Sequence, residues 1–171
     1  MSRCSGGSIV SGLSARSAAT ATGYLVEGVG RGATLYAETL SPLRYLEAVN
    51  EIHTFGRQMA RWFATGPDIL LSATLAEPPA KVGRFAHTTE DYLDYRIGPN
   101  GIFAYSPFCA IFNASGQPAA SVPLAMSSTG LPIGIHLAAP FGNDEELIAL
   151  CAELELAQPW MARRAPPLHP R

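Results

Sequence analysis

Two apolar runs in the last third of the chain, separated by a turn, constrain the fold more than any other feature of the sequence. They cover residues 119–125 and 132–139. The stretch Ser127–Gly130 between them contains the small and polar residues that favour turns. We therefore expect an antiparallel hairpin. Because both runs are largely apolar, the hairpin should lie inside a larger sheet.

Prolines and glycines refine this prediction. Gly116 and Pro118 favour a sharp entry into the first run, since proline fixes φ and glycine tolerates unusual backbone angles. Pro123 cannot donate to a strand ladder, which indicates a bulge or a sheet edge at that point. Gly134 allows a neighbouring group to approach closely.

A long amphipathic helix is predicted to begin after Ser41. Ser41 can serve as the N-cap, and Pro42 suits the first helical position, where a missing N–H costs nothing. Gly66 and Pro67 end the helix. Large apolar side chains recur at steps of three and four residues, which places them on one stripe. The stripe consists of Leu43, Leu46, Val49, Ile52, Phe55, Met59, Trp62 and Phe63.

The remaining elements are shorter. Residues 68–72 form an apolar run that indicates a buried strand, and Pro78 and Pro79 prevent its continuation. Loop with some helical pieces should follow. Asn143 is expected to cap a closing helix, with Glu146 reaching back to form a capping box. The predicted buried stripe of this helix consists of Leu147, Leu150, Cys151 and Leu154.

The order of these elements is helix, strand, loop, two strands and helix, which indicates an α/β layered architecture. So few elements would leave sheet edges or faces uncovered, and natural proteins avoid such exposure. We therefore expect the chain to be part of something larger. Residues 1–33 are small and polar and should be poorly ordered, whereas residues 34–171 should form the folded part.

Composition excludes several classes of function. The net charge is −2 and basic residues form no run, so a nucleic-acid partner is not expected. No apolar stretch is long enough for a membrane span or a signal peptide. Cys4, Cys109 and Cys151 have neither metal-ligand spacing nor a disulfide framework, which favours a reducing, cytoplasmic location and no metal site.

Three stretches together resemble the C-terminal region of amidase-signature enzymes. Residues 66–79 resemble a strand leading into the D-x-L-L-x-P-T segment, with Ala73 where proline is usual. Residues 112–124 resemble the run N-x-x-G-x-P-A-x-S-V-P. Residues 130–145 resemble a G-L-P-x-G-x-Q segment followed by D-E, with His136 in place of the common glutamine. Several motifs agree in order and spacing, so the resemblance is specific.

The resemblance covers roughly residues 34–167 and implies both a fold and an activity. The fold would be the C-terminal portion of an amidase-type α/β/α sandwich with a mixed sheet, incomplete on its own. The activity would be hydrolysis of the C–N bond of a carboxylic amide, without metal or organic cofactor. In the complete enzyme, the chain would bind a small amide substrate. By itself, it would pair with a missing N-terminal segment or self-associate with a second copy.

The family's catalytic residues are expected to be absent from this chain. Amidase-signature enzymes use a Ser-Ser-Lys triad, in which the lysine is the general base. The stretch Cys4–Ser8 contains Gly-Gly-Ser, but Ile9 and Val10 follow where the second serine and a glycine are required. Lys81 is the only lysine in the sequence and follows two prolines in an expected surface loop, so a solvated position is the better interpretation.

Other residues with reactive side chains favour structural interpretations. His53 lies beside the apolar stripe of the long helix, and His87 lies in a polar loop. His136 alternates within an apolar strand, where a hydrogen-bonded structural histidine is expected. Cys109 and Cys151 are flanked by apolar residues and resemble small buried hydrophobes.

By resemblance, Phe108, Phe112 and Asn113 border the acyl or amide pocket. The competing interpretation is core packing for the two phenylalanines and a turn or cap role for Asn113. Two other functions remain open. The chain could be a non-catalytic remnant or interaction subunit with the same half-fold. It could also be an amidotransferase subunit acting on charged tRNA. That alternative rests on the same family resemblance, and no feature of the sequence supports it separately.

Overall fold

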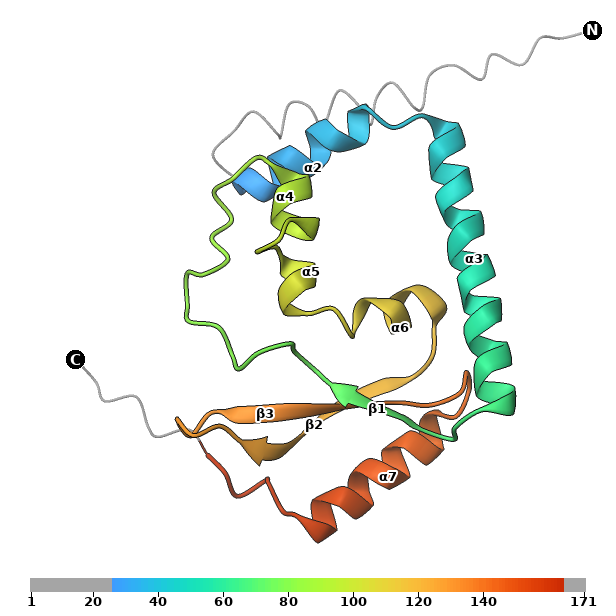
Figure 1. Cartoon of the computed structure of the whole chain (residues 1–171), viewed down its shortest axis with the longest axis vertical. Coiled ribbons are helices and arrows are strands. Elements are labelled where there is room, and N and C mark those ends of the chain that lie inside the picture. Colours follow the sequence, from blue (N-terminus) through green and yellow to red (C-terminus); the bar gives the residue numbers. More distant parts are fainter. Residues whose placement is uncertain (1–25, 165–171) are drawn as a thin grey trace, which may run out of the picture.

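A computed structural model of the chain describes residues 26–164. Six helices and three strands follow one another in this range (Figure 1). The helices are α2 (Gly28–Glu38), α3 (Pro42–Thr65), α4 (Tyr92–Ile97), α5 (Ile102–Tyr105), α6 (Ala110–Ser115) and α7 (Asp144–Ala157), and the strands are β1 (Leu70–Ala73), β2 (Ala119–Met126) and β3 (Pro132–Ala138).

The strands form one antiparallel sheet with the order β1-β3-β2. The hairpin of β2 and β3 is the one that the two apolar runs predict. Its register shifts between Val122 and Ala125, which confirms the irregularity expected at Pro123. α7 lies on one side of the sheet and α5 and α6 lie on the other (Figure 1). The structure therefore confirms the α/β class, with a small, open sheet.

The hydrophobic core lies between the sheet and α7. Val122, Leu137, Ala139 and Leu147 form a buried cluster. Side chains alternate between the two faces of a strand, so Val122 on β2 and Leu137 on β3 both reach the α7 side. The other three members of the predicted α7 stripe are partly buried against this cluster, as expected: Leu150, Cys151 and Leu154.

α3 has the predicted ends, but other residues of the range 26–164 leave much of its apolar stripe uncovered. Ser41 Oγ accepts a hydrogen bond of 3.2 Å from the Arg44 N–H, which confirms the N-cap, and Gly66 follows the last residue. Phe63 is the buried residue of this helix. Leu43, near its start, is 64% exposed, and other large stripe residues are also exposed. Among the described residues, the apolar stripe thus has no partner over much of its length, as expected of an incomplete fold.

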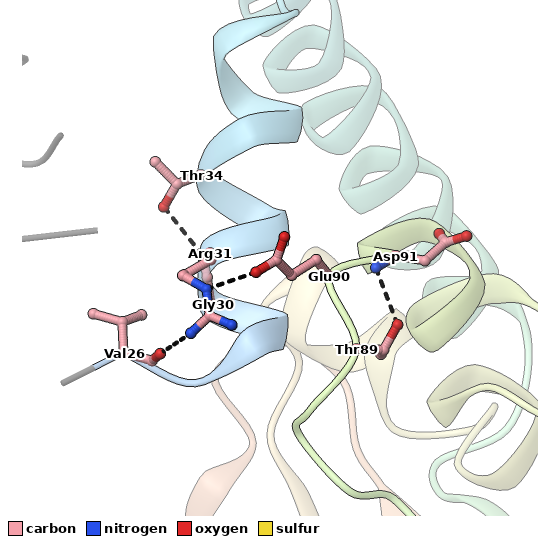
Figure 2. Close-up of polar contacts among 7 residues, drawn as sticks. All are labelled: Val26, Gly30, Arg31, Thr34, Thr89, Glu90 and Asp91. Atoms are coloured by element: carbon pink, nitrogen blue, oxygen red, sulfur yellow. Dashed lines mark hydrogen bonds and ion pairs between the residues drawn. The ribbon is translucent and has the colours of Figure 1, made fainter. Parts of the chain in front are cut away.

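The N-terminal boundary between residues 33 and 34 needs correction, because α2 crosses it. Gly28 and Gly32 are buried in α2, and a Cβ on either would overlap the carbonyl oxygen of Thr88 or Glu90. Figure 2 shows the same junction, where Arg31 Nε donates to Glu90 Oε1 at 2.7 Å. Residues 26–33 are therefore part of the fold. The predicted disorder of residues 1–25 lies outside the described residues.

The start of α7 corrects a second detail. Asn143 occupies the N-cap position, but its φ of −90° and ψ of 41° differ from the extended backbone usual there, and its side chain makes no cap hydrogen bond. Instead, Asn143 Nδ2 donates to Glu146 Oε2 at 2.6 Å, and the Asn143 N–H donates to the Pro140 carbonyl. The predicted capping box is therefore wrong, although the helix begins where expected.

Candidate functional site

The sheet surface facing α6 carries a group of polar side chains from all three strands. Ser72, His136 and Ser121 lie directly opposite one another in the register of β1, β3 and β2. Paired residues point to the same face, and so do residues two positions away along a strand. Thr74 and Gly134 therefore belong to this surface as well, and we call these five residues the hydroxyl face.

Within the hydroxyl face, Thr74 and Ser121 are joined across the central strand. Their hydroxyl oxygens lie 2.6 Å apart. Gly134 lies between them on β3, and a Cβ at that position would lie 2.6 Å from both oxygens. The close neighbour expected at Gly134 is therefore this pair of hydroxyl groups.

His136 is the buried member of the hydroxyl face, with 5% of its surface exposed. Its Nδ1 lies 3.3 Å from Ser72 Oγ, and its ring lies 5.2 Å from the ring of Phe112. Burial lowers the pKa of His136 below its usual value, so the imidazole is neutral at pH 7. This geometry agrees with the structural histidine predicted from the sequence.

The three predicted pocket residues differ in their exposure and in their distance from this surface. Phe112, on α6, is buried against His136, whereas Asn113 is exposed on the same helix. Phe108 is partly buried in the segment before α6. Cys109, next to it, approaches the sheet, with Sγ 3.5 Å from the Thr74 carbonyl oxygen. The structure thus brings Phe112 to the hydroxyl face and leaves Asn113 in solvent, and a role of these residues in substrate binding remains a prediction.

The other residues with reactive side chains occupy structural or solvated positions. Lys81 is exposed in a loop, as expected, and His53 is exposed on α3. His87 Nδ1 contacts the carboxylate of Glu27. Burial raises the pKa of the Cys151 thiol, which suits a small core residue rather than a nucleophile.

Residues 26–164 contain neither a cluster of metal-binding side chains nor a helix suited to crossing a membrane. No group of three or more His, Cys, Asp and Glu side chains within that range has the arrangement of a metal site. None of the helices in that range combines the length and the apolar character that a membrane crossing requires. Ser5 and Ser8 lie outside the described residues.

The structure also contains a cavity that the sequence analysis did not identify. It has a volume of about 540 Å³ and lies between the β2–β3 turn and the segment after α7. None of the three predicted pocket residues lines it. Its walls come from parts of the chain more than thirty residues apart, such as Met126 and Trp160, so no local pattern signals it.

Comparison with known proteins identifies the family. The family model described as Amidase matches residues 4–148. The chain belongs to the amidase family. It is 32% identical over 136 residues to the 6-aminohexanoate-cyclic-dimer hydrolase of Paenarthrobacter ureafaciens, which covers 78% of this chain and 28% of the relative. It is 36% identical over 119 residues to the putative amidase AmiC of Mycobacterium tuberculosis, covering 70% of this chain and 24% of the relative.

Solved structures agree with this assignment. The structure of 6-aminohexanoate cyclic dimer hydrolase matches with a TM-score of 0.71 and 28% identity, over 81% of this chain and 29% of that one. A bacterial aryl acylamidase of the amidase-signature family matches with a TM-score of 0.55 and 26% identity, over 77% of this chain and 27% of that one. The chain thus spans less than a third of the length of the relatives it matches.

Proposed function

We propose that these residues form the C-terminal portion of an amidase catalytic domain that hydrolyses a carboxylic amide to an acid and ammonia or an amine. The observation that carries the proposal is the amidase family match across residues 4–148. In this proposal the family's Ser-Ser-Lys residues come from another part of the domain. The sequence supports this division, because its one lysine, Lys81, is exposed in a loop.

In the complete domain, this portion supplies a wall of the active site rather than the nucleophile. Phe108, Phe112 and Asn113 border the pocket for the acyl or amide group. The substrate is a small amide, and the reaction needs neither metal nor organic cofactor. A solved structure of the related hydrolase contains that enzyme's substrate, which supports the substrate class.

The first experiment measures amide hydrolysis by the purified chain of 171 residues. We expect no turnover of simple amides above a buffer blank, because the general base is missing. Turnover that is abolished by Ser5→Ala or Ser8→Ala would contradict the proposal that the catalytic residues come from another part of the domain. These two variants test whether any observed activity comes from a serine of the N-terminal Ser/Gly stretch.

A chimaera tests the amidase assignment itself. The segment of the Paenarthrobacter hydrolase that matches this chain is replaced by the corresponding residues of this chain. We expect a folded chimaera that hydrolyses the cyclic dimer of 6-aminohexanoate or another small amide. A folded chimaera with no turnover of any amide tested would favour the non-catalytic interaction subunit instead.

We also expect the isolated chain to self-associate, since much of its apolar surface lies in solvent. Burying a Leu or Ile side chain contributes about 1.5–3 kcal/mol, and the α3 stripe offers several such groups. Size-exclusion chromatography with light scattering measures the mass. A sharp monomer peak at 18.1 kDa with cooperative melting would contradict the half-fold interpretation.

A further inference from the structure

The cavity of about 540 Å³ beside the β2–β3 turn has one wall made by the chain that returns to this turn after α7 (Figure 1). Hydrogen bonds hold this returning segment in place. The Trp160 and Met161 N–H groups both donate to Glu155 Oε1, at 3.0 and 3.1 Å. The Arg163 N–H donates to the Trp160 carbonyl at 2.8 Å and closes a turn. This wall of the cavity therefore has a defined shape.

The opposite wall is the turn of the hairpin, which is equally well defined. The Ser127 N–H donates to the Leu131 carbonyl at 2.7 Å, and the Leu131 N–H donates to Ser127 Oγ at 3.0 Å. Arg163 Nη1 joins the two walls, because it donates to the Pro123 carbonyl of β2 at 3.0 Å. The cavity is thus preformed, as small-molecule sites usually are.

Most of the side chains that line the cavity are apolar. Met126 and Leu131 come from the hairpin, and Trp160 and Met161 come from the returning segment. Trp160 is partly buried against the core, whereas the other three side chains are exposed. Methionine side chains adapt to ligands of different shape, and the indole ring offers a flat apolar surface. These four side chains can therefore hold an apolar chain or ring.

The charged groups of the cavity all have the same sign. Arg163 and Arg164 line it, and no acidic residue of the range 26–164 does so. Neither arginine forms an ion pair with another residue of that range. Arg163 uses one N–H for the Pro123 carbonyl, and a guanidinium group has five. The remaining donors are suited to an anion, above all to a carboxylate, whose two oxygens match the fork of an arginine.

We propose that this cavity binds an organic carboxylate that carries an apolar chain or ring. The apolar part lies between the hairpin turn and Trp160, and the carboxylate pairs with the guanidinium groups of Arg163 and Arg164. The combination of one anionic end and an apolar body follows from the two kinds of lining side chain. The proposal goes beyond the proposed function, because binding of this ligand requires neither an amide bond nor a catalytic residue.

Fluorescence of Trp160 tests the proposal with octanoate as the probe. The sequence contains two tryptophans, so Trp62→Phe in the chain of 171 residues leaves Trp160 as the only one. Trp62 lies on α3 and does not line the cavity. Octan-1-ol has the same chain length without the charge, and octyl phosphate carries a different anion. The titrations are done at neutral pH, where a carboxylate is ionised.

Three single substitutions are made in this Trp62→Phe chain. Arg164→Gln removes a charge from the cavity and breaks no hydrogen bond within residues 26–164. Arg163→Gln removes the other charge together with the contact to Pro123. Arg61→Gln is the matched control, because Arg61 is exposed on α3 and does not line the cavity. Circular dichroism and urea midpoints like those of the parent show that a variant still folds.

We expect octanoate to produce a saturable change in Trp160 emission, and octan-1-ol to bind at least about tenfold more weakly. Arg163→Gln and Arg164→Gln should each raise the Kd of octanoate about tenfold, as expected for the loss of a charged hydrogen-bond donor. Arg61→Gln should leave that Kd unchanged.

Four outcomes would overturn the proposal. Equal affinity for octan-1-ol and octanoate would show that the cavity does not recognise the anion. Tighter binding of octyl phosphate would assign the site to phosphate esters instead. An unchanged Kd in folded Arg163→Gln and Arg164→Gln would exclude these two partners. Finally, octanoate could change the emission of Trp62 in a Trp160→Phe chain without changing that of Trp160, which would place the ligand on the apolar stripe of α3.

Discussion

The hydroxyl groups of Thr74 and Ser121 lie 2.6 Å apart, although Thr74 directly follows β1, Ser121 lies on β2, and these two strands are not neighbours in the sheet. The two side chains meet above Gly134 of the central strand. A residue with a side chain at that position would separate them, since its Cβ would lie 2.6 Å from either oxygen. The contact therefore depends on the absence of a side chain at Gly134.

The first prediction concerns this position. Gly134→Ala should lower the free energy of unfolding by about 1–3 kcal/mol, the usual cost of overpacking. Ser121→Ala should cost about 1 kcal/mol, the typical net value of one hydrogen bond. The double variant should lose less than the sum, because removing the Ser121 hydroxyl makes room for the new methyl group.

Urea unfolding followed by tryptophan fluorescence, at one protein concentration for all variants, measures these differences. Gly56→Ala is the control. Its Cβ would lie 3.5 Å from the nearest atom, the Ser115 carbonyl oxygen, and Gly56 lies inside α3. Alanine should therefore stabilise the helix there by about 0.5–1 kcal/mol. Equal midpoints for Gly134→Ala and the parent would show that the hydroxyl pair is not constrained by the glycine.

A second prediction compares two helix starts. Ser41→Ala should cost about 1 kcal/mol, because Ser41 Oγ satisfies a backbone N–H of α3. Asn143→Ala should cost only about 0.2–0.5 kcal/mol, the usual value of an exposed side-chain pair, because Asn143 bonds to Glu146 and not to the backbone of α7. Urea midpoints of the two variants measure the difference. A larger loss for Asn143→Ala would restore the capping box that the sequence suggested.

A third prediction concerns pH. Burial lowers the pKa of His136 in the folded state, so the unfolded state binds a proton more readily. In the unfolded state the pKa of histidine is about 6.5. Above that pH the contribution of the neutral ring to stability is complete, and it is lost as the pH falls from there through the lower pKa of the folded state. The free energy of unfolding should therefore fall between pH 7.5 and 5.5.

His136→Gln should reduce that pH dependence, because glutamine does not titrate and can still hydrogen-bond to Ser72. His53→Gln is the control, since His53 is exposed on α3. Urea midpoints at each pH give the slopes. An identical slope in the parent and in His136→Gln would mean that other groups account for the acid sensitivity.

The parts of this fold that depend on local signals could be predicted from the sequence. Ser41 and Gly66 mark the ends of α3 correctly, because caps and breakers act within a few residues. The irregularity at Pro123 and the close neighbour at Gly134 also follow from the chemistry of one residue each. Asn143 shows the limit, since the same residues allow two hydrogen-bonding patterns and the backbone angle selects between them.

The candidate site could be predicted only in part. The sequence predicts that His136 is a hydrogen-bonded structural residue, but it cannot name the partner Ser72, which is 64 positions away and is set by the strand register. The same holds for Thr74 and Ser121, which are 47 positions apart. The sequence predicts poor order for the first half of α2, because its glycines have no helical preference and become buried only against residues 88–90.

The last prediction concerns this docking of α2, drawn in Figure 2. Arg31 and Glu90 form an ion pair at the surface, and such pairs contribute about 0–1 kcal/mol. Gly32 packs directly on the Glu90 carbonyl, where a Cβ would overlap backbone that cannot rotate away. Gly32→Ala should therefore detach α2 from residues 88–90, whereas Arg31→Ala should leave it docked. Hydrogen exchange of the α2 amides measures local opening, and about tenfold faster exchange corresponds to about 1.4 kcal/mol. We expect at least that acceleration in Gly32→Ala and much less in Arg31→Ala. If Arg31→Ala accelerated exchange more, the ion pair rather than the close backbone approach would hold α2 in place.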